Sequence, residues 1–183
     1  MSELLTAAQQ EFLLRLARET ITAHLRGEKK PSPAAADPVL KGKRGAFVTL
    51  HIDGDLRGCI GYPLPYKPLI ETISEMALAA ATQDTRFESI REDELGRLRI
   101  EISALTLPVP IQDPAEVEVG RHGIIVSKGG RQGLLLPQVP TEYGWDRETF
   151  LRHGCLKAGL PDDAWQKGAS IQVFEAQVFS EAE

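Results

Sequence analysis

The segment from residue 46 to residue 61 constrains the fold of this chain more than any other, because its pattern predicts a β-hairpin. Alternating apolar and polar residues occupy positions 46–52 and 56–60. Between them lies Asp53-Gly54-Asp55, a sequence typical of tight turns. The pattern therefore places two antiparallel strands side by side and leaves their register to be decided.

Two registers are open for this hairpin. If residues 53–55 form a three-residue loop, Leu50 lies opposite Gly58, and the apolar side chains gather on one face. The other face then carries four side chains: Thr49, His51, Arg57 and Cys59. A two-residue Asp53-Gly54 turn would instead mix Cys59 and Arg57 with the apolar side chains. We favour the first register, since a one-residue slip moves a whole apolar set into water.

The second strand contains an unusual hexapeptide, Leu-Arg-Gly-Cys-Ile-Gly, at residues 56–61. Glycine weakens a strand and is tolerated where a backbone or ligand approaches closely, so Gly58 and Gly61 predict an access point beside Cys59. Arg57 lies two residues away, roughly 7 Å by Cα, and would favour the reactive thiolate if both side chains faced a cleft. The alternative is that Cys59 is a small buried apolar residue, which is common for a free cysteine.

Composition indicates an ordinary globular protein. A chain of 183 residues with 42% hydrophobic and 26% charged content is long enough for one domain, here residues 1–183, and too short for a second independent core. The sequence contains no apolar run of membrane-spanning length and no secretory pattern, so we expect a cytoplasmic protein that binds no membrane.

The two cysteines, Cys59 and Cys155, lack zinc-site spacing, and no cofactor or metal site is predicted. The net charge of −5 does not favour nucleic acid as a partner.

Helical and strand patterns are interspersed along the chain. Helices are predicted after the capping box Thr6–Gln9, over residues 69–80, after a box at Ser89–Glu92, and after Asp146. Strands are predicted at 98–104, in three glycine-punctuated runs at 117–119, 124–126 and 134–136, and at 171–179 with a change of apolar phase near Phe174. A Pro-rich surface linker occupies about residues 28–44. Because hairpins dominate, we predict an α+β fold with a largely antiparallel sheet and flanking helices.

Other residues are candidates for a site. His122, between glycines in a loop, is a candidate base, although a turn histidine in solvent is the simpler interpretation. Glu101 and Ser103 share the polar face of the strand at 98–104 and would reach a cleft or stay solvated. Cys155 is interpreted as a core residue of a helix.

Short motifs covering nearly the whole chain closely resemble the AMMECR domain family, protein A of AmmeMemoRadiSam systems. The hexapeptide at 56–61 is the hallmark of that family. The remaining matches, in family order, are Phe47-Val48-Thr49-Leu50, Asp84-x-Arg86-Phe87, Ile102-Ser103, Gly120-x-His122-Gly123, Leu135-Leu136-Pro137-Gln138-Val139 and Lys157-Ala158-Gly159-Leu160.

The resemblance implies a two-subdomain α+β fold with the hallmark motif near a cleft. It also implies partners, namely a Memo-type protein similar to metal-dependent dioxygenases and a radical S-adenosylmethionine enzyme. No established reaction comes with the family. The matching motifs add Asp84, Arg86, Phe87 and Gln138 to the candidate binding residues.

Three functional hypotheses follow. In the first, Cys59 is a nucleophile or covalent carrier, Arg57 holds an anion or the thiolate, Gly58 and Gly61 admit the substrate, and His122 carries a proton. In the second, the protein is a non-catalytic recognition module for those partners or for a small-molecule or peptide ligand. Its contact candidates are Arg57, Arg86, Phe87 and Trp145. A third, RNA or modified-nucleotide binding through Lys41, Lys43, Arg44 and Arg131, is disfavoured by the acidic charge.

Overall fold

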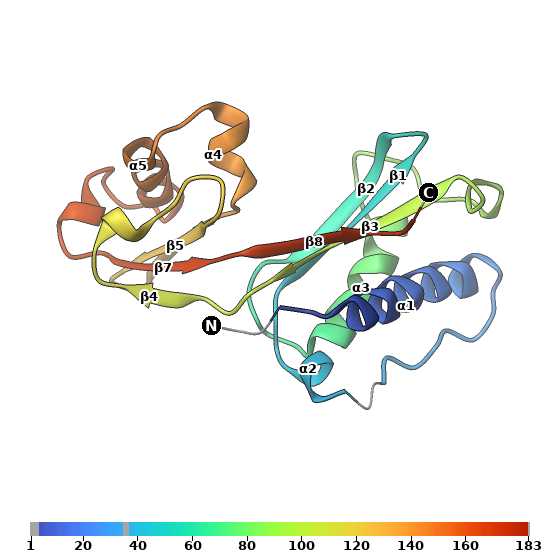
Figure 1. The fold of residues 1–183 in the computed structure, drawn as a ribbon. Helices are drawn as coiled ribbons and strands as arrows, with labels where there is room; N and C mark the ends of the chain where they lie inside the picture. Colours follow the sequence, from blue (N-terminus) through green and yellow to red (C-terminus); the bar gives the residue numbers. More distant parts are fainter. Residues whose placement is uncertain (1–3, 35–36, 183) are drawn as a thin grey trace. The chain divides into compact units, whose positions relative to one another are not determined.

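The computed structural model describes residues 4–34 and 37–182, which form two compact units (Figure 1). Of the described residues, the larger unit comprises those in 4–105 and 177–182, and the smaller unit comprises 106–176. Each unit has its own four-stranded sheet, and both sheets are antiparallel. The predicted α+β class is therefore confirmed, with two sheets where the sequence indicated one. The predicted cleft between subdomains stays a prediction.

The sheet of the larger unit has the strand order β2-β1-β3-β8. Its strands are β1 (Ala46–Ile52), β2 (Asp55–Tyr62), β3 (Leu98–Leu105) and β8 (Ala176–Ser180). Its helices are α1 (Ala7–Leu25), α2 (Pro38–Lys41), α3 (Leu69–Thr82) and a 3-10 turn at Glu92–Glu94. Figure 1 shows α1 and α3 packed on one side of this sheet. The other side of the sheet is therefore the one that can carry polar side chains.

Helix α1 begins and ends where its sequence predicts. The Thr6 hydroxyl accepts a hydrogen bond from the Gln9 N–H, and the Gln9 side chain accepts one from the Thr6 N–H, so the capping box is formed. The chain leaves the helix at Gly27, whose φ of 65° is one that glycine adopts without strain.

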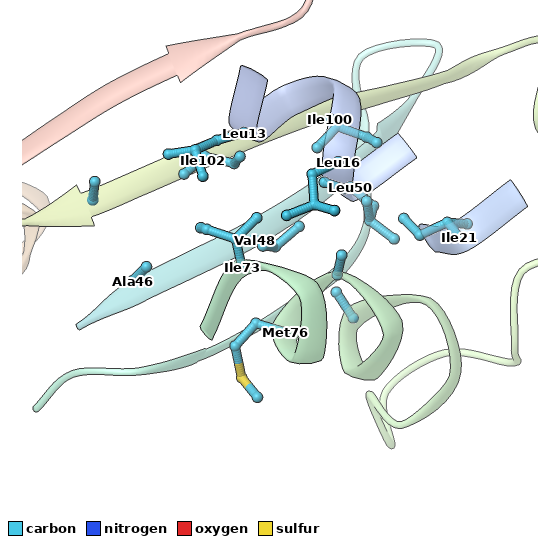
Figure 2. Close-up of a cluster of buried hydrophobic side chains, with 14 of the residues drawn as sticks. Leu13, Leu16, Ile21, Ala46, Val48, Leu50, Ile73, Met76, Ile100 and Ile102 are labelled. Atoms are coloured by element: carbon cyan, nitrogen blue, oxygen red, sulfur yellow. The ribbon is translucent and has the colours of Figure 1, made fainter. Parts of the chain in front are cut away.

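The core of the larger unit lies between the sheet and these two helices (Figure 2). Val48 and Leu50 of β1 and Ile100 and Ile102 of β3 point inward, as strand alternation requires. They meet a set of side chains from the helices: Leu13, Leu16, Ile21, Ile73 and Met76. Alternation then sends Thr49 and its neighbours to the opposite face of the sheet.

The β1–β2 hairpin combines features of both registers considered for it. Asp53 and Gly54 have φ of 53° and 86°, the positive values that a two-residue type I′ turn needs, so the predicted three-residue loop is wrong. A β-bulge between Leu50 and His51 leaves Arg57 as an extra residue on β2. From there the favoured register is confirmed, and the following pairs face each other: Leu50 and Gly58, Thr49 and Cys59, Val48 and Ile60.

The glycines of the hexapeptide make room for the protein itself. A Cβ at Gly58 would collide with the carbonyl oxygen of Ala80 in α3, and one at Gly61 would collide with the Phe47 ring. Gly58 is buried, so the space beside it belongs to the helix that packs there. This corrects the expectation that these glycines open an access point for a ligand.

The sheet of the smaller unit has the order β4-β7-β5-β6. Its strands are β4 (Val109–Ile111), β5 (Gly123–Lys128), β6 (Arg131–Leu135) and β7 (Ser170–Phe174). Its helices are α4 (Gln138–Tyr143), α5 (Arg147–Lys157) and 3-10 turns at Pro114–Glu116 and Ala164–Gln166. Asp146 caps α5 as predicted, and Cys155 is fully buried in the core with Phe150.

Three local predictions change in the structure. Residues 117–119 form no strand and lead from the 3-10 segment into a turn at 119–121, and the strand at β4 was not predicted. The short helix near residue 92 is a 3-10 turn capped by Arg91 and Glu94, because Glu94 accepts the Arg91 N–H. The predicted strand at 171–179 divides at Glu175, whose N–H and C=O are hydrogen-bonded to Thr106. This division explains the change of apolar phase within the predicted strand.

In the described part of the chain, no helix is long and apolar enough to cross a bilayer.

Replacing Gly58 by alanine is expected to lower the free energy of unfolding by about 1–3 kcal/mol. The new methyl group would collide with the backbone of α3 at Ala80, and the helix would have to shift to accommodate it. Gly96→Ala is the matched control, since no atom lies within 4 Å of the position of its Cβ. Urea unfolding of both variants measures the difference. Equal stability of the two would contradict this account of the hexapeptide.

Candidate functional site

Cys59 lies on the face of the larger sheet that is turned away from α1 and α3. It sits directly opposite Thr49, and its Sγ is 3.1 Å from the Thr49 Oγ1. The side chain is half-buried, in contrast to Cys155. The interpretation of Cys59 as a sealed core residue is therefore wrong, and its thiol is a candidate for chemistry.

Asp84 accepts a hydrogen bond from the backbone of Cys59 at the edge of the sheet. Strand β2 is an edge strand, and the N–H of Cys59 donates to Asp84 Oδ2 at 3.0 Å. An edge strand needs such partners because its outward N–H groups have no neighbouring strand. The carboxylate therefore fixes β2 at the residue that carries the thiol.

Arg86 is paired with the same carboxylate. Its Nε donates to Asp84 Oδ1 at 3.0 Å and its Nη2 to Oδ2 at 2.8 Å, while its backbone N–H also donates to Oδ1. The side chain of Asp84 is 5% exposed and that of Arg86 is 56% exposed, so the cation lies outside the anion. The Arg86 guanidinium holds the pKa of Asp84 well below its usual range, against the opposing effect of burial and with help from the Cys59 N–H. Arg86 also stacks over the Phe87 ring, 5.3 Å from its centroid.

Arg57 does not take the role that its position in the hexapeptide predicts. Its guanidinium donates to both carboxylate oxygens of Glu94, at 3.1 and 3.2 Å, and to the carbonyl oxygens of Glu88 and Ser89. The side chains of Arg57 and Glu94 are 17% and 9% exposed. Burial opposes ionisation of Glu94, but the Arg91 N–H and Arg57 outweigh it, and the pKa of Glu94 lies below its ordinary value. Arg57 thus anchors the segment after α3, and the guanidinium that shares a carboxylate with the backbone N–H of Cys59 is that of Arg86.

The polar face of the sheet brings together several predicted residues. Glu101 pairs with Thr49 across β1 and β3, so Cys59, Thr49 and Glu101 form one row. Ser103 pairs with Phe47, which in turn faces Gly61, and these form the next row. Thr49 is the site residue that the candidate list missed, and its signal was the register that set it opposite Cys59.

A hollow of about 850 Å³ lies further along the same unit, toward the turn of the hairpin. Its lining includes His51, Arg97, Arg99, Glu101 and Glu181. Glu101 therefore lies both in the row of Cys59 and at the border of this hollow.

His122 and Gln138 belong to the smaller unit. His122 is 8% exposed, and its Nδ1 accepts the N–H of Glu118 at 3.0 Å, so it is a buried residue that holds its own turn. Its ordinary interpretation as a solvent-exposed turn histidine is wrong, and its pairing with Cys59 stays a prediction. Gln138 is exposed at the start of α4, and Trp145 is stacked between Tyr143 and His153.

Comparisons with known proteins agree on one family. The family model AMMECR1 matches residues 14–179. A protein of Methanopyrus kandleri is 51% identical over all of this chain and 93% of its own length, and one of Methanosarcina barkeri is 49% identical over 98% of this chain and 94% of its own. The crystal structure of an uncharacterized protein from Pyrococcus horikoshii is similar, with a TM-score of 0.74, 43% identity, and coverage of 93% of this chain and 90% of that one.

Replacing Asp84 by asparagine is expected to lower the free energy of unfolding by about 1–3 kcal/mol at neutral pH, because it removes a buried charge-assisted pair. The folded pKa of Asp84 lies below the unfolded value of about 3.9, so the pair stabilises the fold above that pH and its contribution is lost as pH falls further. The difference between wild type and variant should therefore stay constant near neutral pH and shrink in acid, in urea unfolding at a series of pH values.

Asp93→Asn is the matched control for this experiment. Asp93 is also paired with an arginine, Arg91, but its side chain is 70% exposed. Such a surface pair contributes about 0–1 kcal/mol. Equal losses in the two variants, or a difference that does not shrink in acid, would contradict the importance of Asp84.

Proposed function

Because this chain belongs to the AMMECR1 family, we propose that it is a cytosolic pathway component whose Cys59 thiol acts as a nucleophile or covalent carrier. The observation that carries the proposal is the half-buried Cys59 itself, on the polar face of the sheet with a hydroxyl 3.1 Å from its sulfur. A structural cysteine would sit where Cys155 does, in the core.

The chemistry that suits this arrangement is transfer of a group through the thiol. The thiolate attacks an electrophilic carbon of the substrate, a carbon–sulfur bond forms, and the leaving group departs with its electron pair. The proton of the thiol passes to solvent or to a base. Transfer of the group to an acceptor then breaks the carbon–sulfur bond and restores the thiol. Asp84, with Arg86 as its ion-pair partner, accepts the Cys59 N–H and so fixes the backbone that carries this sulfur.

The partners in this proposal are a Memo-type protein and a radical S-adenosylmethionine enzyme. Their support is the resemblance of the sequence motifs to protein A of AmmeMemoRadiSam systems. A small soluble carrier that holds a reactive group on a cysteine is compatible with a pathway in which other proteins form and use that group.

Alkylation of the folded protein with iodoacetamide tests the thiol chemistry. We expect Cys59 to react in the native state, because its side chain is half-buried on the polar face of the sheet. Cys155 is the internal control, because burial raises the pKa of its thiol and the core covers its sulfur. Peptide mass spectrometry reads the two sites separately. A folded protein in which Cys59 is unreactive would count against the proposal.

A second candidate function is recognition of those partners without catalysis. It is favoured by the exposed Arg86 guanidinium stacked on Phe87, since arginine and aromatic residues dominate the energetics of many interfaces. Strand β2 also exposes Leu56 and Tyr62 close by in sequence. These side chains would form the contact surface.

Two variants separate the candidates when the purified partners are titrated. If the protein is a recognition module, Cys59→Ser keeps partner binding and cellular function, whereas Arg86→Ala loses binding by about tenfold or more. If Cys59 is the functional group, Cys59→Ser loses cellular function while partner binding is retained. Isothermal titration and complementation of a deletion strain measure the two properties.

A further inference from the structure

We infer that the substrate that reacts at Cys59 is an anion and that Arg86 binds its negatively charged oxygen atoms. This inference rests on the proposed function of the thiol. The sequence suggested Arg57, two residues from Cys59, as the anion-binding residue. We assign this role instead to Arg86, which is 27 positions from Cys59 and bonds to Asp84, the carboxylate that also accepts the Cys59 N–H.

The first support is the position of the guanidinium. Asp84 Oδ2 accepts hydrogen bonds from the Cys59 N–H at 3.0 Å and from Arg86 Nη2 at 2.8 Å. The two nitrogens are therefore no farther apart than these two distances together. The hydrogen bond that Arg86 donates to Asp84 is the largest of the effects that raise the pKa of Arg86, and Cys59 makes a smaller contribution.

The second support is the set of donors that remain. Asp84 occupies Nε and one N–H of Nη2. Among the hydrogen bonds of the described residues, none involves Nη1 of Arg86. Nη1 and the second N–H of Nη2 therefore remain as a fork of donors on a side chain that is 56% exposed. A planar carboxylate or a phosphate oxygen pair matches such a fork. Arg57, in contrast, uses all three of its guanidinium nitrogens on Glu94, Glu88 and Ser89.

The third support is preorganisation. An arginine side chain loses about 2 kcal/mol of rotamer entropy when it is fixed, and Asp84 and Phe87 already fix this one before any ligand arrives. The carboxylate of Asp84 neutralises part of the charge but is buried behind the guanidinium, so an approaching solute meets the cation first.

Glu101 carries an opposing charge on the same face of the sheet as Cys59. It lies two strands from Cys59, which is about 10 Å at ordinary strand spacing. This exceeds the Debye length of about 8 Å at physiological salt, so its repulsion of an anion that reacts at Cys59 is largely screened.

A matched pair of reagents tests the inference. Iodoacetate and iodoacetamide both form a carbon–sulfur bond with the thiolate and release iodide with the bonding electron pair, while the thiol proton goes to the buffer. They differ in that iodoacetate carries a carboxylate. The ratio of their rates at Cys59 therefore reports anion preference and cancels changes in the amount of thiolate.

We expect this ratio to be about tenfold higher in the folded protein than at the same cysteine in urea, as one hydrogen-bonded charge pair would give. Arg86→Gln should return the ratio to the value in urea, and Arg86→Lys should keep part of the preference. Arg91→Gln is the matched control, since it removes an exposed arginine from the same segment without touching Asp84, and it should keep the wild-type ratio. Added salt should reduce the preference.

The outcomes separate the two proposals. If Cys59 reacts rapidly with iodoacetamide but shows no preference for iodoacetate, or if the preference survives in Arg86→Gln, the inference is wrong while the thiol chemistry stands. A loss of preference in Arg91→Gln equal to that in Arg86→Gln would also overturn it, because net charge would then explain the effect. A thiol that reacts with neither reagent overturns the proposed function and this inference together.

Discussion

A single buried carboxylate, that of Asp84, determines the geometry of the candidate site. It accepts one hydrogen bond from the N–H of Cys59 on the edge strand and two from the guanidinium of Arg86. Because an ionised carboxylate in this position needs a cation, the group that completes the hydrogen bonding of β2 also holds the Arg86 guanidinium at the edge of the sheet. Fold stability and site geometry therefore depend on one group.

The bulge at Arg57 has the complementary effect. By inserting an extra residue, it lets the tight Asp53-Gly54 turn coexist with the register that places Val48 and Leu50 in the core. Arg57 is thereby directed to Glu94, where a buried ion pair holds the segment after α3. The two arginines thus have different partners: Arg57 pairs with Glu94, and Arg86 pairs with the carboxylate that accepts the Cys59 N–H.

Much of the fold was predictable from local patterns. The capping box at Thr6, the cap at Asp146 and the inward alternation of β1 and β3 act over a few residues, and the structure confirms them. The errors lie where a distant contact overrides a local preference. Residues 171–179 read as one strand, yet Glu175 pairs with Thr106, 69 positions away, and divides it between two sheets.

The sequence by itself determined the α+β class, the hairpin that carries the hexapeptide, and Cys59 as the residue of interest. Only the tertiary structure decided which carboxylate and guanidinium hold the edge strand at that residue and why its neighbouring glycines are needed. Asp84 is 25 residues from Cys59, Glu94 is 37 from Arg57, and Ala80 occupies the space beside Gly58. Strand periodicity is a short-range property of the chain, and it carries no information about contacts that form only when α3 and the segment after it pack against the sheet.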